Sequence, residues 1–471
     1  MKCDLMLRRG WLVDPANGIE GLRDLAVHQG KVSAVAESLG EAEAKREMDL
    51  SGRVIAPGLI DTHVHVGGRP HWVGHRMVAE SGVTTAFDMG CRMADLIDGM
   101  ETAGAGMNVG GLLASTVAFR DETDPKTEHI GSTLERELEA GALGLKLLGG
   151  HIPLTPEATA RCIEEANRRA VYVAYHLGTT ESSSNLHGMR ELPVLLGGEG
   201  RVHLAHVAAY CRGMVEAPLR ECEETLAILA SLGPRVVSES YLSTQIGTGN
   251  ATSGFCRGNE VEDQVTRNCL AMRSYGPTRE ALRQAMLDGY CSAYVHRGER
   301  VELVEREEAV DAWEQAGTAL GVSFPVTPAE SALVLTLARD EGGDFAIDAL
   351  ATDGGAIPRN YMVERGLALV RLGALTLADY VRKVSLDPAR MLALPEKGQL
   401  GVGADADITV LDLERGRAVA SLVAGDSIMI DGTVVGSGGV LLTTEAGTAV
   451  ARRAKLRYQV VEPAAALMYQ D

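Results

Sequence analysis

The chain has 471 residues, of which 45% are hydrophobic, so it is long enough for a large folded core and a smaller second module. Its formal net charge of −19 argues against nucleic acid and anionic membranes as partners. The eight cysteines have no paired spacing, which favours free thiols in a reducing cytoplasm over a disulfide framework. The N-terminus lacks the layout of a signal peptide and no apolar run is long enough to cross a bilayer, so we expect a cytoplasmic protein.

Residues 1–56 are short β-prone runs separated by turn residues. We predict two hairpins in this segment, the first pairing 4–7 with 10–14 and the second pairing 23–28 with 30–35. A unit of this size is too small to bury its own sheet, so it needs partner strands from elsewhere in the chain.

The C-terminal region, 395–471, offers such partners in the β-prone runs 406–411, 427–430 and 433–435. We therefore expect both chain ends to build one small β-sandwich domain, from 1–56 and 395–471. The alternative is two unrelated β modules.

Between these ends, residues 57–394 repeat the pattern of strand, loop and helix. One helix is predicted at 156–169, with Thr155 as its N-cap and Pro156 at its first position. Strands that alternate with helices imply a parallel sheet, and this number of repeats implies an α/β fold closed into a (β/α)8 TIM-like barrel. The predicted strands after the first are 83–87, 107–115, 143–148, 171–176, 202–207, 235–238 and 346–352.

The region from about 242 to 340 is too long for one connection within a barrel. It contains a polar loop at 243–254 and helical patterns such as 277–288. We interpret this region as a large insertion after the seventh strand that forms a lid over the strand ends.

The first barrel strand ends in two histidines, His63 and His65, one residue apart. Residues i and i+2 of a strand point to the same face, so both imidazoles can aim at one metal ion. A structural pair of histidines is the alternative, since this spacing alone is weak evidence. Their position favours ligands, because the apolar run gives way there to the glycine loop Gly67-Gly68, where an α/β barrel keeps its catalytic residues.

The run P-G-L-I-D-T-H-V-H at 57–65 resembles the first-strand signature of the amidohydrolase superfamily, which includes dihydroorotases, hydantoinases and N-acyl-D-amino-acid deacylases. The run G-V-G-A-D-A-D at 401–407 resembles the return strand of the same superfamily. The resemblance implies a barrel hydrolase that holds two divalent metal ions, with zinc as the first choice. The ligands that it implies are His63, His65, His176, His206 and Asp353.

Two of these residues have sequence arguments of their own. His176 and His206 are 30 residues apart, which fits one strand–helix–strand step of a barrel. His203 is the rival of His206, and we expect it to face the other way on the same strand and to lie deeper. In the superfamily, the residue equivalent to Asp353 also moves the proton between the attacking water and the leaving nitrogen.

Lys146 lies in an apolar strand without a neighbouring carboxylate, and a buried lysine without a partner is rare unless it has a function. In many superfamily members, the equivalent lysine reacts with CO₂ and the resulting carbamate bridges the two metals. We therefore expect a carboxylated Lys146; the alternative is a lysine that reaches the barrel rim or pairs with a distant carboxylate. Cys91 resembles the thiolate ligand of the D-aminoacylase branch and is a secondary candidate, because an ordinary buried cysteine fits equally well.

The residues that bind substrate are less defined. Dihydroorotase-like chains often have an arginine two residues after the second histidine, but here Gly67 holds that position. Four further residues are candidate substrate contacts, and for each arginine a position on the surface rim is the alternative: Arg69, Arg212, Tyr241 and Arg359.

Together these features predict a metal-dependent hydrolase of a C–N bond, with a small-molecule amide as substrate. Metal coordination lowers the pKa of bound water toward about 7, which makes hydroxide available at neutral pH. Lys146 favours a cyclic amide or imide as substrate, whereas Cys91 and Asp353 favour an N-acyl-D-amino acid. A non-catalytic barrel scaffold is the alternative from another class, although such relatives generally lose ligands. We also expect a homo-oligomer, with neither nucleic acid nor membrane as a partner.

Overall fold

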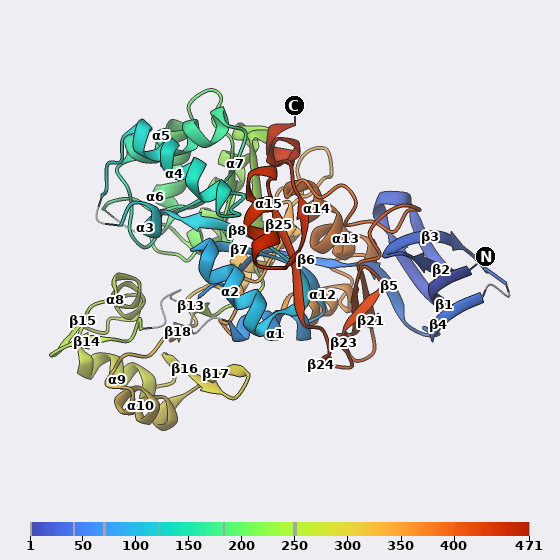
Figure 1. The fold of residues 1–471 in the computed structure, drawn as a ribbon. Helices are drawn as coiled ribbons and strands as arrows, with labels where there is room; N and C mark the ends of the chain where they lie inside the picture. Colours follow the sequence, from blue (N-terminus) through green and yellow to red (C-terminus); the bar gives the residue numbers. More distant parts are fainter. Residues whose placement is uncertain are drawn as a thin grey trace.

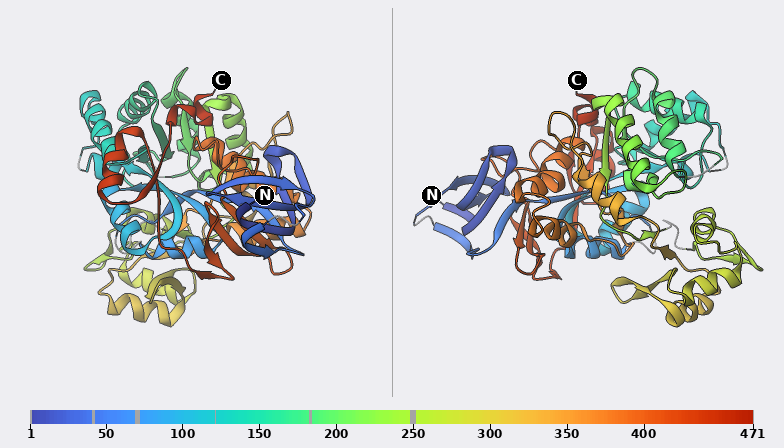
Figure 2. Two further views of the ribbon diagram at one scale, coloured as in Figure 1. Left: turned by 45° about the vertical axis from the view of Figure 1, so that its right-hand side comes forward. Right: turned by 180° about the vertical axis from the view of Figure 1, so that it is seen from behind.

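The computed structural model describes residues 2–40, 43–68, 72–120, 122–181, 184–247 and 252–470. The fold consists of a central barrel, a mixed sheet on one side and a separate lobe below the barrel (Figure 1). Two further views show that the lobe and the mixed sheet lie at opposite ends of the molecule (Figure 2). No helix in the described part of the chain is long and apolar enough to cross a membrane.

Eight parallel strands form the barrel sheet in the order of the chain, as the strand–helix repeat predicted. The barrel is closed by β20 (Gly354–Gly355), which directly follows Asp353. This short strand pairs in parallel with Val64 and His65 of the first barrel strand. The eight strands are β6 (Leu59–His65), β7 (Val83–Cys91), β8 (Ala105–Ala114), β9 (Gly144–Leu148), β10 (Tyr172–His176), β11 (Val202–Leu204), β12 (Val236–Ser240) and β19 (Ala349–Leu350).

Helices between these strands cover the outside of the barrel. The predicted start of α5 is confirmed, because the Thr155 side chain accepts a hydrogen bond from the Ala158 backbone at 3.2 Å and Pro156 is the first helical residue. The helices are α1 (Val73–Glu80), α2 (Met93–Ala103), α3 (Ser115–Ala118), α4 (Thr127–Glu139), α5 (Pro156–Arg168), α6 (Leu186–Leu196), α7 (Pro218–Leu232), α11 (Ala329–Leu337), α12 (Met362–Arg371), α13 (Leu377–Val381) and α14 (Asp387–Met391).

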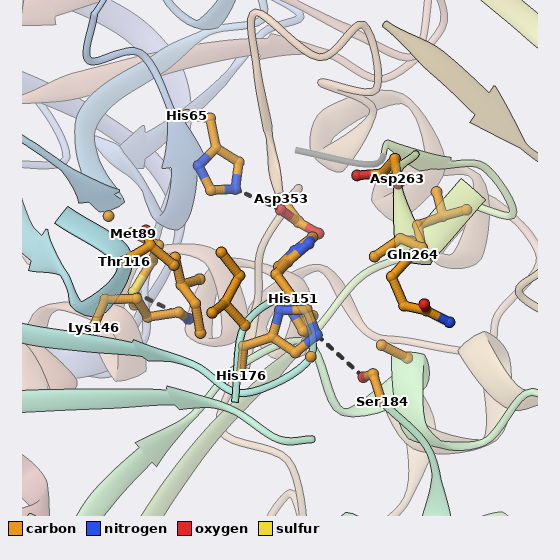
Figure 3. A pocket seen from close by; sticks show the side chains of 18 of the residues that line it. His65, Met89, Thr116, Lys146, His151, His176, Ser184, Asp263, Gln264 and Asp353 are labelled. Carbon is orange, nitrogen blue, oxygen red and sulfur yellow. Dashed lines mark hydrogen bonds and ion pairs between the residues drawn. The ribbon is translucent and has the colours of Figure 1, made fainter. Parts of the chain in front are cut away.

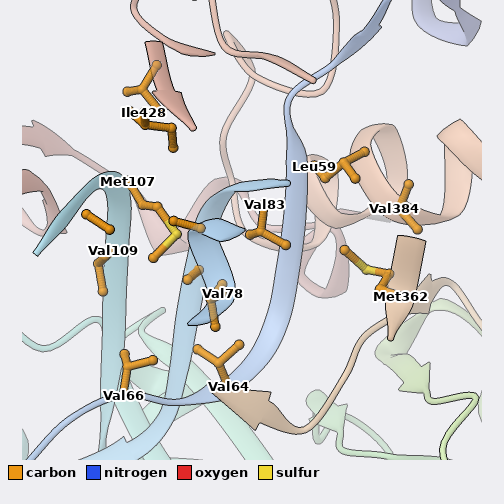
Figure 4. Packing of buried hydrophobic residues seen from close by; sticks show 14 of the residues in the cluster. Leu59, Val64, Val66, Val78, Val83, Met107, Val109, Met362, Val384 and Ile428 are labelled. Atoms are coloured by element: carbon orange, nitrogen blue, oxygen red, sulfur yellow. The ribbon is translucent and has the colours of Figure 1, made fainter. Parts of the chain in front are cut away.

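The largest buried cluster joins the first barrel strands to their helices (Figure 4). Val64 and Val83 of neighbouring strands pack with Val78 of α1 and Met362 of α12. The strand that carries His63 and His65 is therefore fixed from outside by apolar contacts, which keeps the histidine backbone in one place.

Both chain ends form one mixed sheet, as the sequence predicted. The two ends meet where β5 pairs antiparallel with β21, for example Val410 with Ile55. The strands are β1 (Lys2–Asp14), β2 (Ile19–His28), β3 (Lys31–Ala36), β4 (Glu43–Asp49), β5 (Val54–Pro57), β21 (Ile408–Asp412), β22 (Arg417–Val423), β23 (Asp426–Ile430) and β24 (Thr433–Val434).

The prediction for the first hairpin is wrong. Residues 4–14 lie in one strand, β1, whose pairing with β2 shifts between Leu7 and Gly10. Arg9 has a left-handed backbone with φ of 57°, so the segment makes a bulge where a turn was expected. The second predicted hairpin is confirmed as β2 and β3, which pair from His28 with Lys31.

The last residues leave the mixed sheet and return to the barrel. The strand β25 (Gly438–Thr443) pairs in parallel with the first half of β8, and β26 (Arg457–Val460) pairs with β25. The short helix α15 (Thr448–Arg453) connects these two strands. Leu442 joins the buried cluster of Phe87 and Tyr172, so the C-terminal segment completes the barrel core.

The lobe lies between β12 and β19, where the insertion after the seventh strand was expected. It has its own apolar cluster, in which Trp313 is fully buried. After the lobe, α11 packs against α7 of the barrel. The lobe elements are β13 (Ile246–Gly247), β14 (Cys256–Arg257), β15 (Glu260–Val261), α8 (Gln264–Ala271), α9 (Arg279–Leu287), β16 (Ser292–Arg297), β17 (Arg300–Val304), α10 (Arg306–Gln315) and β18 (Val322–Phe324).

Candidate metal centre

His63, His65 and Asp353 lie together at the carboxyl ends of the barrel strands (Figure 3 shows His65 and Asp353). The Asp353 Oδ1 atom is 3.3 Å from His63 Nε2 and 3.0 Å from His65 Nε2. All three ligand atoms lie within 4.8 Å of one another. This spacing suits one metal ion between them, because bonds from zinc to nitrogen or oxygen are about 2 Å long.

The two other histidines lie against this group. The ring of His206 stacks on His63 with centroids 5.1 Å apart, and the ring of His176 meets His206 edge-on at 4.3 Å. The structure therefore brings both residues within the reach of about 10 Å that a pair of metal ions with shared ligands allows.

The backbone turns sharply at two of these residues. His206 has φ of 34° and Asp353 has φ of 51°, both in the left-handed region that residues other than glycine seldom adopt. Each lies within three residues of the end of a short strand, β11 or β19, and its side chain lines the pocket at the barrel mouth. Such strain persists where surrounding contacts fix it and is concentrated at functional sites.

The prediction that His203 and His206 face opposite sides of one strand is wrong. The strand β11 ends at Leu204, so the alternation of a strand does not extend to His206. His203 also points into the barrel, where its Nδ1 atom is 2.9 Å from the Tyr172 hydroxyl. The two histidines differ in depth and not in face, and only His206 stacks against His63.

Lys146 is fully buried on β9 and lines the same pocket as the histidines. Within the described residues, the one hydrogen-bond contact of its amine is the Met89 sulfur at 3.8 Å. Burial lowers the pKa of Lys146 to about 8, although Glu239, Asp353 and Asp88 oppose this shift. Lys146 therefore does not reach the barrel rim, and it forms no salt bridge with any of the described residues.

Glu239 is a buried residue of the site that the sequence analysis missed. It lies on β12, and its Oε1 atom accepts a hydrogen bond from His63 Nδ1 at 2.6 Å. The signal was present, because a carboxylate in the run Val236-Val237-Ser238-Glu239 is as unexpected in a barrel strand as Lys146. The predicted strand ended two residues too early, at Ser238, because β12 extends to Ser240.

The pocket around these groups has a volume of about 530 Å³. Barrel residues form its floor, and lobe residues such as Phe255, Asp263 and Gln264 line the opposite wall (Figure 3 shows the last two). A pocket of this size is typical of small-molecule sites.

Comparison with known proteins identifies a matching family model and similar proteins. The Amidohydrolase family matches residues 332–441. The dihydroorotase of Syntrophus aciditrophicus is 24% identical over 445 residues, which cover 87% of this chain and 89% of that protein. The dihydroorotase of Pelotomaculum thermopropionicum is 26% identical over 451 residues, with 87% and 88% covered. These comparisons show that the chain is similar to members of the amidohydrolase superfamily.

Solved structures support the amidohydrolase fold. A D-aminoacylase mutant in complex with CuCl₂ superposes with a TM-score of 0.68 at 17% identity, covering 94% of this chain and all of the other. A D-hydantoinase gives a TM-score of 0.55 at 18% identity, with 93% and 98% covered. The N-acyl-D-glutamate deacylase of Bordetella bronchiseptica, complexed with zinc, gives 0.66 at 17%, with 93% and 99% covered.

The protonation states of the candidate histidines and of Asp353 are those that binding of a divalent cation requires. Burial lowers the pKa of His63 to about 4, and burial likewise holds the pKa values of His176 and His206 well below the usual range, so these rings are neutral, as metal ligands must be. Burial alone would raise the pKa of Asp353, but the charge of Arg359 and the interactions with the neighbouring histidines outweigh it and hold this pKa well below its usual range. The His206 Nδ1 atom is buried without a hydrogen-bond partner among the described residues, as expected for a ligand atom.

The remaining candidates differ in position. Cys91 is buried beside Gly67 at the end of β7 and is absent from the described lining of the pocket. Burial, with the charge of Asp88, raises the pKa of its thiol well above the usual value. Arg69 lies outside the described residues.

The two candidate arginines that the structure describes differ in their contacts. Arg359 is buried and engaged, because its guanidinium pairs with the Asp353 carboxylate and donates to the Asp353 carbonyl at 2.5 Å. Arg212 lines the pocket, and its nearest polar contact is the Tyr241 hydroxyl at 3.3 Å. The Tyr241 hydroxyl also lies 3.1 Å from Thr327, so this tyrosine holds the position of Arg212.

Proposed function

We propose that this protein is a cytoplasmic, metal-dependent hydrolase of amide C–N bonds, with a cyclic amide or imide as substrate. The observation that carries the proposal is the convergence of His63, His65 and Asp353 in one pocket with Lys146, which forms no ion pair within the described residues. The similarity to dihydroorotases over most of the chain supports the cyclic substrate. The eight free cysteines support a reducing location.

His63, His65, His176, His206 and Asp353 would hold two divalent cations, with zinc as the first choice because a structural neighbour is complexed with zinc. When bound, such cations polarise the amide carbonyl and make hydroxide available near neutral pH. Asp353 is ionised, so its carboxylate can accept the proton of the attacking water and return it to the leaving nitrogen. Arg359 holds this carboxylate in place from the side away from the histidines.

Lys146 supplies the second part of the proposal. A desolvated amine spends more time neutral than a solvated one, and only the neutral amine attacks CO₂. The resulting carbamate would place two oxygens where the buried amine now lies without a charged partner. A carboxylated Lys146 therefore accounts for a buried lysine that the described residues leave unpaired.

Arg212 is the proposed contact for a substrate carboxylate. It faces the pocket, its Nε atom is buried without a hydrogen-bond partner among the described residues, and a guanidinium binds a carboxylate through two parallel hydrogen bonds. An acidic cyclic amide would place its carboxylate at Arg212 and its reactive carbonyl at Asp353.

A linear N-acyl amino acid is the second candidate. The volume of about 530 Å³ and the lobe wall leave room for a longer substrate than a small ring. Cys91 remains the secondary ligand candidate for that branch, although it lies outside the described lining of the pocket.

The test is a substrate screen on protein with measured metal content. We expect hydrolysis of dihydroorotate, hydantoins or related imides by protein that contains one to two zinc ions per chain, and no hydrolysis after chelation. Preferential hydrolysis of N-acyl-D-amino acids would favour the second candidate. Protein that binds no zinc and hydrolyses none of these compounds would identify a non-catalytic barrel. Size-exclusion chromatography of the same sample tests the proposed homo-oligomer.

A further inference from the structure

Glu239 is a buried carboxylate that the proposed reaction does not use. We propose that Glu239 is a positioning residue, which holds His63 in the orientation and tautomer that bind metal. The proposal rests on the metal site of the proposed function, and it adds a residue to that site from a different barrel strand.

The geometry at His63 gives the first argument. An imidazole carries one proton when neutral, and the proton can be on either nitrogen. The Glu239 Oε1 atom is 2.6 Å from His63 Nδ1, so the proton belongs on Nδ1 and is donated to the carboxylate. The lone pair is then on Nε2, the atom that lies 3.3 Å from Asp353 Oδ1 within the metal group. A carboxylate behind a histidine also makes the imidazole a stronger ligand.

The surroundings of Glu239 give the second argument. Its side chain is fully buried, and within the described residues it contacts His63 and, at 3.7 Å, the Nε2 atom of His203, while the amine of Lys146 interacts with it electrostatically without an ion pair. No lysine or arginine in the described part of the chain forms an ion pair with it. A buried carboxylate that no lysine or arginine contacts is costly, so its retention needs a reason that packing does not provide.

Strand placement makes the contact rigid. Glu239 lies on β12, which pairs with β11 on one side and with β19, the strand before Asp353, on the other. His203 is held in turn by the Tyr172 hydroxyl at 2.9 Å. The Glu239 carboxylate therefore contacts His63 at Nδ1, whereas the Asp353 carboxylate lies at its other ring nitrogen, Nε2.

The test measures zinc binding by the metal-free protein in competition with a chromophoric chelator. We expect Glu239→Gln to bind zinc about 10 to 100 times more weakly than wild type, the range found when such outer carboxylates are removed. The visible spectrum of the cobalt-substituted protein should also change, because His63 becomes free to rotate. Asp348→Asn is the matched control: Asp348 is half-buried, accepts a hydrogen bond from the Ser238 backbone at 2.7 Å and is not among the described lining residues of the pocket.

The control variant should bind zinc as wild type does, even if its melting temperature falls. Wild-type zinc affinity in a folded Glu239→Gln variant would overturn the inference and leave the proposed function intact. Absence of zinc binding in wild type would instead overturn the proposed function and this inference with it. If Glu239→Gln does not fold, Glu239→Asp is judged by the same criterion, since it keeps the charge but withdraws the carboxylate from His63.

Discussion

At the scale of the residue, we expect Lys146 to be required for hydrolysis and at the same time to lower the stability of the metal-free protein. A pKa of about 8 in place of 10.5 means that burying the protonated amine costs the metal-free protein about 3 kcal/mol. We expect Lys146→Met to abolish hydrolysis and to raise the unfolding midpoint of the metal-free protein at pH 7, because the substitution removes the buried cation and keeps an apolar side chain of similar length.

The pH dependence of that difference has a definite sign. Below pH 8, Lys146 is protonated in the folded and unfolded states, so the full penalty applies. Between about pH 8 and 10.5 the folded state releases the proton first, and the stability of wild type rises with pH. Urea unfolding in bicarbonate-free buffer should therefore show the advantage of Lys146→Met shrinking across this window. A constant difference between the two proteins would contradict the assigned burial.

The carbamate itself is tested by replacement of the lysine. We expect Lys146→Ala to lose activity and at least one metal, and to regain part of both with excess zinc and acetate or propionate, which can occupy the vacated space. Lys146→Arg should not respond, because its guanidinium fills the space with a fixed charge. Carbonyl-region NMR of wild type prepared with labelled bicarbonate provides the direct measurement. An unmodified amine in fully metallated, active protein would exclude the carbamate.

At the scale of the element, we expect the lobe to contribute to substrate binding and not to metal binding, because lobe residues line the pocket. Trp313 anchors the lobe core, and its Nε1 atom donates to the Gly254 carbonyl at 2.8 Å. Trp313→Ala should lower the free energy of unfolding of the lobe by about 3–5 kcal/mol. We expect KM to rise about tenfold, which corresponds to roughly 1.4 kcal/mol of lost contact with the substrate.

Zinc content separates this effect from general damage, because the candidate ligands all belong to the barrel. It should stay at the wild-type level in Trp313→Ala. Trp11→Ala, which removes a tryptophan that is 42% exposed on the terminal sheet, should change neither KM nor zinc content. Loss of zinc from Trp313→Ala would show that the lobe supports the metal centre directly.

At the scale of the whole molecule, the C-terminal segment is part of the barrel. Leu442 on β25 is 1% exposed and packs in the cluster that contains Phe87 and Tyr172. Leu442→Ala should lower the free energy of unfolding by about 2–5 kcal/mol. Zinc release and the loss of near-UV circular dichroism should occur together at the lowered melting temperature, because β25 and the ligand strands belong to one sheet.

The matched control is Val435→Ala. Val435 lies just before β25 and is 52% exposed, so its effect should stay within about 0.5 kcal/mol. If Leu442→Ala unfolded the C-terminal segment and left zinc binding and barrel melting unchanged, the segment would be an independent module. The domain division at residues 57 and 395 stays a proposal, which residues 438–443 complicate by pairing with β8.

The sequence by itself determined the parts of this protein that depend on local patterns. Apolar runs alternating with helical patterns predict a closed parallel barrel, because hydrophobic periodicity is a property of neighbouring residues. His63 and His65 could be paired because two residues of one strand share a face. Lys146 stood out because one charge in an apolar strand is visible without any knowledge of the fold.

Only the tertiary structure decided the contacts between distant strands. Glu239 meets His63 across 176 residues of chain, and Arg359 pairs with Asp353, so neither contact follows from local sequence. The insertion of β25 beside β8 likewise depends on a gap in the sheet that exists only in the folded barrel. Periodicity gives the face of each side chain, but the partner across the barrel is set by register and closure, which are properties of the whole sheet.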